Sequence, residues 1–310
     1  MSILSSEFFV VDKKNNISPF QNLLAYLFGS AFQTTIDNPI TAYRQLVQQF
    51  AKDKNGLIVD PKIATKEANN IFKKYPLSAS FSGLNPRLVG VGFKTVPKFG
   101  FLWGISFLLG ENEQPGMLAA IGSSIFSAYC INPIRMIEKQ QRVNLRTTGK
   151  IKSVIEILKE AKTQNFTPLF RGTLPLMGHS LASATTGLVG QPQLQKKIQK
   201  ILSDETNQNK LFSFSKSTAN FLSSAIVSPI YVVMTNPLSR LEVIMQTSSI
   251  KGKSIPFSDA VKELINDSKN FGLRGMFRGQ GIGIFKAIIS LSLFHEGRMM
   301  ATSFFKKYNS

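Results

Sequence analysis

One tripeptide recurs three times, as Asn38-Pro39-Ile40, Asn132-Pro133-Ile134 and Asn236-Pro237-Leu238, and each copy lies inside a long apolar stretch. Each copy is followed by a polar segment and then by an aromatic residue near a glycine, in Phe81-Ser82-Gly83, Phe170-Arg171-Gly172 and Phe277-Arg278-Gly279. The prolines are 94 and 104 residues apart, and the closing glycines are 89 and 107 residues apart. A fixed order of motifs at a nearly constant period predicts one structural unit used three times.

The period divides the 310 residues into three repeats with an N-terminal segment and one polar connection. The predicted segments are 1–19 (N-terminal), 20–110 (repeat one), 111–190 (repeat two), 191–211 (connection) and 212–310 (repeat three).

The formal net charge of +19 is concentrated between the apolar stretches. Segment 44–86 has seven Lys and Arg against three Asp and Glu, segment 138–171 has eight against three, and segment 240–278 has seven against four. Basic loops beside apolar spans are typical of a membrane protein with those loops on the negative side. A basic nucleic-acid-binding face is the alternative, and we favour the membrane interpretation, with no nucleic-acid partner.

Each repeat contains two stretches long enough for a membrane-spanning helix, which needs about 20 residues. The first stretches are 20–47, 116–142 and 212–246, and the second are 86–109, 173–190 and 281–301. Polar residues such as Asp37, Lys94 and Lys98 interrupt them, and such residues must face a wet cavity or each other. The sequence therefore predicts an all-α membrane protein with six helices around a polar interior.

Pro39, Pro133 and Pro237 occupy the same place in their repeats, so we expect them to kink three helices alike. An ordinary helix terminus is the alternative. Between the spans, 61–74, 150–164 and 258–269 have apolar residues at helical spacing with charges opposite, which predicts three short amphipathic helices on the membrane surface.

The three repeats resemble the mitochondrial carrier family, whose signature is Pro-x-Asp/Glu-x-x-Lys/Arg followed by Asp/Glu-Gly-x-x-x-x-aromatic-Lys/Arg-Gly. Repeat three keeps the second half in Phe271-Gly272-Leu273-Arg274-Gly275-Met276-Phe277-Arg278-Gly279, except for the acidic residue. The resemblance covers residues 20–301 and implies a pseudo-three-fold bundle of six transmembrane helices with three short matrix helices.

The resemblance also implies a multi-pass protein of the mitochondrial inner membrane with both termini in the intermembrane space. The sequence has neither a secretory signal nor the composition of a transit peptide, so we expect targeting information to be internal. The single cysteine, Cys130, excludes an internal disulfide framework. Cardiolipin is the bound lipid that the family implies, at basic residues and glycines near helix N-termini. These positions are Gly56, Gly83, Gly149, Arg171, Gly172, Gly252, Arg278 and Gly279, and a helix cap or turn is the alternative role for each glycine.

In the family, acidic and basic motif residues of neighbouring repeats form a matrix-side ring of salt bridges. The corresponding residues here are Thr41 and Arg44, Arg135 and Glu138, and Ser239 and Glu242. Thr41 with Glu138 and Ser239 with Arg44 cannot form ion pairs, so we expect only Arg135 and Glu242 to do so. The glutamine that braces the ring is present as Gln48 and Gln246 but is Arg142 in repeat two.

A second ring of charges in the family lies near the far ends of the even-numbered helices. This chain has Phe101-Leu102-Trp103, Gln191-Pro192-Gln193 and Phe294-His295-Glu296 around those places, and only Glu296 offers a carboxylate. Two rings that have lost most of their charges leave little to stabilise two alternate states, both of which a transporter must populate.

The family's substrate contact positions are Gly90, Lys94, Lys98, His179, Ser180 and Lys286 in this chain. Three lysines and a histidine that face a cavity would suit an anion. The alternatives are lysines that neutralise a buried carboxylate or extend to the interface, and a histidine that packs between helices.

Two functions follow. We favour a degenerate carrier that serves as a structural or accessory subunit of a larger inner-membrane complex, such as one of the respiratory chain, with other subunits as partners. The alternative is an active carrier of a small anionic metabolite. The sequence shows no catalytic or metal-binding constellation, so we expect no enzyme and no cofactor apart from bound cardiolipin.

Overall fold

The computed structural model describes residues 18–50, 59–108, 117–185, 216–250 and 255–309. These residues form helices and connecting turns, with no strand among them. Six helices form the bundle and are called the long helices below, although α7 has only 13 described residues: α1 (Pro19–Gln49), α4 (Leu84–Leu108), α5 (Met117–Thr148), α7 (Thr173–Thr185), α9 (Lys216–Ile250) and α12 (Gln280–Asn309). The short ones are α2 (Pro61–Lys74), α3 (Pro76–Phe81), α6 (Val154–Lys162), the 3-10 helix η1 (Thr167–Phe170), α10 (Phe257–Phe271) and α11 (Leu273–Met276).

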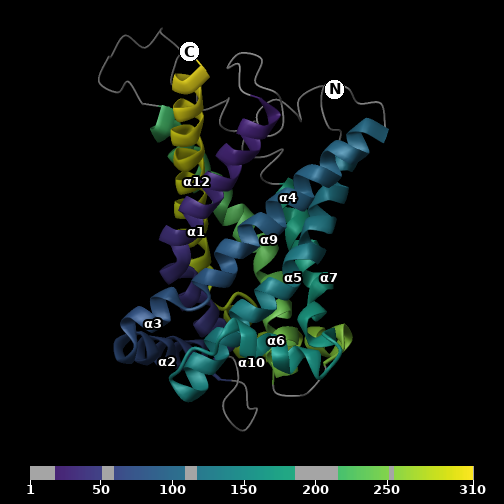
Figure 1. Cartoon of the computed structure of the whole chain (residues 1–310). Coiled ribbons are helices and arrows are strands. Elements are labelled where there is room, and N and C mark those ends of the chain that lie inside the picture. The colour runs from purple at the N-terminus through teal and green to yellow at the C-terminus, as the bar shows by residue number, and fades with distance from the viewer. Residues whose placement is uncertain (1–17, 51–58, 109–116, 186–215, 251–254, 310) are drawn as a thin grey trace, which may run out of the picture.

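The long helices form a closed ring in chain order. Each of α1, α4, α5, α7, α9 and α12 packs against the next, and α12 packs back against α1. Figure 1 shows the six helices as one bundle, with α2, α3, α6 and α10 gathered at one end. Helix α1 begins and α12 ends at the opposite end. This arrangement agrees with a helical bundle built from three two-helix repeats.

The predicted helices 20–47 and 86–109 agree with α1 and α4 to within two residues, whereas α5 and α12 extend six and eight residues beyond the predicted ends at 142 and 301. At 173–190, α7 ends at Thr185 and the remainder lies outside the described residues. Pro39, Pro133 and Pro237 all lie inside helices, so the alternative of a helix terminus is wrong. No sequence pattern predicted α3, η1 and α11. Two further prolines, Pro97 in α4 and Pro229 in α9, also lie inside helices and were not predicted to do so.

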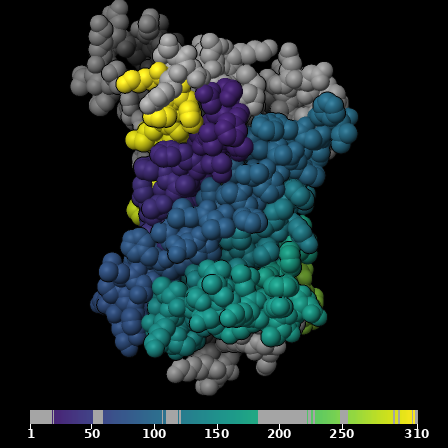
Figure 2. Space-filling model, viewed as in Figure 1, coloured from purple at the N-terminus to yellow at the C-terminus, as the bar shows by residue number. Residues whose placement is uncertain are grey.

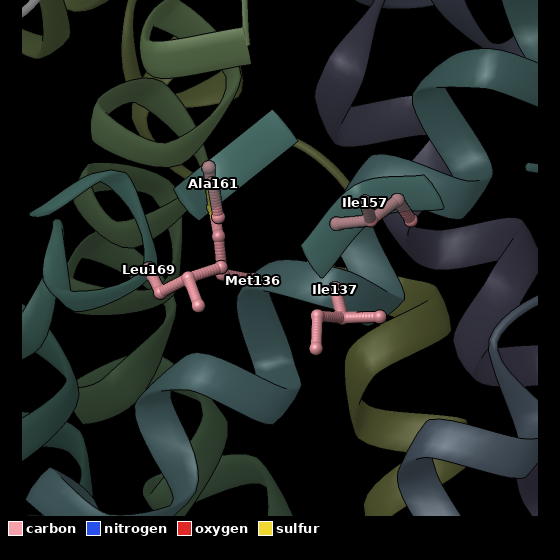
Figure 3. Close-up of a cluster of buried hydrophobic side chains, with 5 residues drawn as sticks. All are labelled: Met136, Ile137, Ile157, Ala161 and Leu169. Carbon is pink, nitrogen blue, oxygen red and sulfur yellow. The ribbon is translucent and has the colours of Figure 1, made fainter. Parts of the chain in front are cut away.

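Each of the three amphipathic helices α2, α6 and α10 is held to its repeat by a small apolar cluster. In repeat two, Met136 and Ile137 of α5 contact Ile157 and Ala161 of α6 and Leu169 of η1, as Figure 3 shows. Similar clusters join α9 to α10 and α1 to α2. The apolar face predicted for these three helices is therefore the face that holds them in position. Helix α6 is shorter at both ends than the predicted 150–164, and it begins with a capping box between Ser153 and Glu156.

The closing glycines confirm the repeat at the level of the backbone. Gly83, Gly172 and Gly279 have φ values of 73°, 78° and 76°, a left-handed conformation that residues with a Cβ rarely adopt. Each directly precedes the second long helix of its repeat, which is α4, α7 or α12. The same turn is therefore built three times, by the same residue.

The long helices carry large apolar side chains on the outside of the bundle. Phe28, Phe93, Phe126, Phe285 and Phe304 are each at least 40% exposed. Figure 2 shows one face of the molecule, on which α1 (purple) and α12 (yellow) lie side by side and residues of repeats one and two, in blue and teal, cover the middle and lower parts. An apolar exterior around charged interior side chains is the arrangement expected of a bundle in lipid.

By mean hydropathy, none of the helices in the described ranges has an apolar stretch long and uncharged enough to qualify as a membrane span. The six membrane crossings therefore remain a prediction, although six long helices are observed.

Candidate functional site

Cations from several helices face the interior of the ring. Lys94 of α4 interacts electrostatically with Lys98 and Arg87 of its own helix, with Arg135 of α5 and with Lys286 of α12. Lys94 is nevertheless solvent-exposed, and the side chains of Arg135 and Lys286 are 30% and 22% exposed. A charged side chain that is exposed among residues of three helices requires an interior that water can enter.

One carboxylate, Asp37, organises the interior on the side of α1. It is fully buried, and its oxygens lie 2.8 Å from a guanidinium nitrogen of Arg87 and 3.7 Å from the ammonium of Lys286. It also accepts a hydrogen bond from the hydroxyl of Ser290. The alternative role for the interior lysines, neutralisation of a buried carboxylate, therefore applies to Lys286.

The predicted ion pair between repeats two and three is present. Arg135 of α5 lies 3.4 Å from Glu242 of α9, so the prediction that these residues meet is confirmed. Lys139, one turn further along α5, lies 2.9 Å from the other carboxylate oxygen of Glu242. Glu242 is 2% exposed, so this junction contains a buried carboxylate between two cations, one of which the motif does not predict.

Between repeats one and two, Thr41 and Glu138 form no ion pair, as expected, but Glu138 is not left without a partner. It accepts hydrogen bonds from Arg142 of its own helix and, at 3.2 Å, from the Gln45 amide of α1. Arg142 also donates to Gln45, to Asn38 and to the carbonyl of Ser82. The arginine that replaces the bracing glutamine thus joins α5 to repeat one.

Between repeats three and one, Arg44 donates to the amide oxygen of Asn236 at 2.8 Å. Ser239 provides no carboxylate there, as expected. Instead Arg240, which follows Ser239, donates to the backbone carbonyl of Gln48 at 3.0 Å. Arg240 also pairs with Asp267 of α10, whose other oxygen lies 3.0 Å from Arg278. All three charged side chains are at most 3% exposed.

These contacts close the interior at the end of the bundle that carries α2, α6 and α10. Glu138, Lys139, Arg142 and Glu242 are at most 5% exposed there. We call this end, formed by these four residues together with Gln45, Arg240 and Asp267, the closed end. Charges outside the motif pairs contribute to this end, because Lys139, Arg142 and Arg240 lie one or more residues away from the motif positions.

The two bracing glutamines, Gln48 and Gln246, differ in the hydrogen bonds of their side chains. Gln246 donates to Asn132 and to the carbonyl of Arg171, so it joins α9 to repeat two. The Gln48 side chain is 1% exposed, and its amide nitrogen has no hydrogen-bond partner among the described residues. Its backbone carbonyl accepts the hydrogen bond from Arg240 described above.

The remaining predicted substrate positions lie on α4 and α7. Gly90 packs against Ile131 and Ile134 of α5, and His179 of α7 lies 3.3 Å from the Tyr231 hydroxyl of α9. Ser180 is half-buried on α7 beside His179. His179 also interacts electrostatically with Arg135 and Lys94, so it lies with Lys94, Lys98 and Lys286 around the interior.

The predicted cardiolipin positions are only partly described. Two of these positions, Gly56 and Gly252, lie outside the described residues. The Gln191–Gln193 segment of the second ring also lies outside them. Gly149 has a φ of 72° and lies against the ring of Tyr75. Arg171 is half-buried, whereas the guanidinium of Arg278 is turned inward, to Asp267 and the carbonyl of Val59. Leu102, at the second-ring position of repeat one, is buried against Ala119.

The comparison with known families agrees with the repeat and the bundle. No curated protein matches the chain. Residues 213–308, which are repeat three, match the family model described as mitochondrial carrier protein. Proteins of this family are multi-pass proteins of the mitochondrial inner membrane. This match in repeat three and the same motif order in repeats one and two support membership of the mitochondrial carrier family.

Proposed function

We propose that the protein is a degenerate carrier that serves as a structural or accessory subunit of a larger inner-membrane complex. One observation carries this proposal: the C-terminus of α1 is capped by the other two repeats. The last carbonyl groups of a helix have no partner within it. Here Arg146 of α5 donates to the carbonyl of Gln49 at 2.6 Å, and Arg240 of α9 donates to that of Gln48.

Transport would require the closed end to open, which would separate these arginines from α1. Hydrogen bonds to charged groups contribute about 1.5–3 kcal/mol each, so the two caps favour the closed state by about 3–6 kcal/mol. Each 1.4 kcal/mol is about a tenfold change in population. The caps alone therefore reduce the open population by about two to four orders of magnitude, before the buried pairs of Glu242 with Arg135 and Lys139, which join repeats two and three, are broken.

A surface on α4 suits a helix of another subunit. Val89, Phe93, Val96, Gly100, Gly104 and Phe107 are exposed on one side of this helix, away from Lys94 and Lys98. A Cβ added at Gly100 or Gly104 would meet no atom within 4 Å. Two glycines four residues apart let a second helix approach closely in a membrane. We call the side of α4 formed by these six residues the outer α4 face.

The test is complex formation in mitochondria that express variant protein. The double variant Gly100→Leu, Gly104→Leu should shift the protein from a large complex to its own size in native electrophoresis. Leucine has a higher helix propensity than glycine, so the variant should fold. Gly92→Leu is the matched control, because Gly92 also has no atom near its Cβ but points about 80° away from Gly100. If wild-type protein migrates alone, the proposal is wrong.

A second candidate is an active carrier of a small anionic metabolite, and the exposed Lys94 among Arg87, Arg135 and Lys286 favours it. Purified protein in liposomes would then exchange phosphate, a nucleotide or a dicarboxylate with saturable kinetics. Alanine at Lys94, Lys98 and Lys286 would abolish that exchange. Under the structural proposal, wild-type protein exchanges none of these anions, and its loss destabilises a membrane complex.

A further inference from the structure

One carboxylate of the interior belongs to repeat one alone. Asp37 lies two residues before the kink proline of its repeat, and the same place is taken by Ile131 in repeat two and by Thr235 in repeat three. The repeated fold is therefore built twice without a charge at this place. Asp37 also lies outside the charged motif positions, so neither the repeat nor the matrix-side ring explains it.

Donors from three helices surround this carboxylate. Arg87 of α4 donates to one oxygen of Asp37 at 2.8 Å, and Thr41, one turn further along α1, donates to the same oxygen at 3.4 Å. Ser290 of α12 donates to the other oxygen, and the ammonium of Lys286 lies 3.7 Å from it. A buried carboxylate must be paired and hydrogen-bonded, and these contacts meet that condition.

The cations that Asp37 pairs with belong to the surface of the interior. The side chains of Arg87 and Lys286 are 13% and 22% exposed, and both interact electrostatically with the exposed Lys94. Asp37 is the only carboxylate paired with Lys286 among the described residues, whereas Arg87 also lies 3.8 Å from Glu138. Asp37 itself is 0% exposed, so it neutralises these cations from behind, while their other side stays open to water.

We propose that Asp37 is a tethered counter-anion, an intramolecular ligand of the interior cations that weakens the binding of free anions there. The contact is autoinhibitory because a free anion must lose translational freedom in order to bind, whereas a side chain already fixed on α1 does not. The proposal holds for a subunit and for a carrier alike, since it concerns which anion neutralises the interior and not whether the bundle opens.

Titration calorimetry of purified protein in detergent, with inorganic phosphate at constant ionic strength, tests the proposal. Asp37→Asn keeps the shape of the side chain and removes its charge, so it should bind phosphate at least about tenfold more tightly than wild-type protein. Asp259→Asn is the matched control, because it removes the same charge from the exposed surface of α10 and should leave the phosphate affinity unchanged. Adding Lys94→Gln to Asp37→Asn should reverse most of the gain.

Asp37→Ala with added formate separates an inhibitory role from a purely structural one. The variant leaves room for formate beside Arg87, Ser290 and Lys286. At about ten times its dissociation constant, formate should raise the Tm of the variant by about 3 °C. The same formate should weaken phosphate binding by about tenfold, because it returns the missing charge. Formate should change neither property of wild-type protein, in which Asp37 fills the space. The formate titration also replaces Asp37→Asn if that variant does not fold.

Two results would overturn the proposal. In the first, folded Asp37→Asn binds phosphate no more tightly than Asp259→Asn. In the second, formate raises the Tm of Asp37→Ala but leaves its phosphate affinity unchanged, which would make Asp37 a structural partner of the cations only. Complex formation in native electrophoresis tests the proposed function separately, so either proposal can fail while the other stands.

Discussion

Substitution of Asp267 by alanine should destabilise the protein more than the removal of any exposed charged side chain. Asp267 is the only carboxylate bonded to Arg240 and Arg278 among the described residues, and the side chains of the two arginines are 1% and 0% exposed. Removal of one partner from a buried ion pair costs about 3–5 kcal/mol, because the remaining charge is left without compensation. At about 2–4 °C per kcal/mol, the Tm should fall by at least about 6 °C.

The assay is thermal unfolding in detergent, followed by circular dichroism, with Asp259→Ala as the control on the same helix. Asp259 pairs with Lys262 at 3.0 Å, but both side chains are more than half exposed, and such pairs contribute about 0–1 kcal/mol. Adding Arg240→Met to Asp267→Ala should recover part of the loss, since repeat two has Met136 at this position in an apolar cluster. Equal Tm values for Asp267→Ala and Asp259→Ala would refute the reasoning.

Three further predictions concern the junctions, the topology and the repeated turn. Glu242→Gln should cost about 3–5 kcal/mol, whereas Arg135→Gln should cost less because Lys139 stays paired, and the two Tm values measure this difference. In a Cys130→Ser background, a membrane-impermeant maleimide should label a cysteine introduced at Ser18 but not one introduced at Lys262, in mitoplasts whose inner membrane is intact. The reverse pattern of labelling contradicts the proposed orientation. Gly83→Ala should lower the Tm, because its φ of 73° costs alanine about 1–2 kcal/mol and its Cβ would lie 2.7 Å from Glu138, and Gly92→Ala should not.

The sequence predicted the helices well because their signals are local and occur three times. The short helices carry apolar residues at helical spacing, and the motif prolines share one context, so each repeat supports the interpretation of the others. Repeat three also retains enough of the signature to match the carrier family. The pair of Arg135 and Glu242 could be predicted because both residues occupy motif positions whose neighbours are fixed by the pseudo-three-fold arrangement.

The other charges of the closed end could not be predicted in this way. Lys139, Arg142 and Arg240 lie outside the acidic and basic motif positions, and their partners include side chains of other repeats and backbone carbonyls. A backbone carbonyl is present at every residue, so no sequence pattern indicates that Arg240 binds that of Gln48. The exposed interior around Lys94 likewise depends on how six helices pack, although the basic side chains themselves were found from their distance to the closing glycines.

The capped end of α1 has a consequence for how the protein folds. Repeat one contains the carbonyls of Gln48 and Gln49 but not the arginines that bind them, which come from α5 and α9. The N-terminal repeat is therefore completed only after the last repeat has inserted, at the same step in which α12 meets α1 and closes the ring. A chain that stops before α9 would keep an unfinished first helix, so quality control at the membrane could distinguish truncated chains from complete ones by the end that was made first.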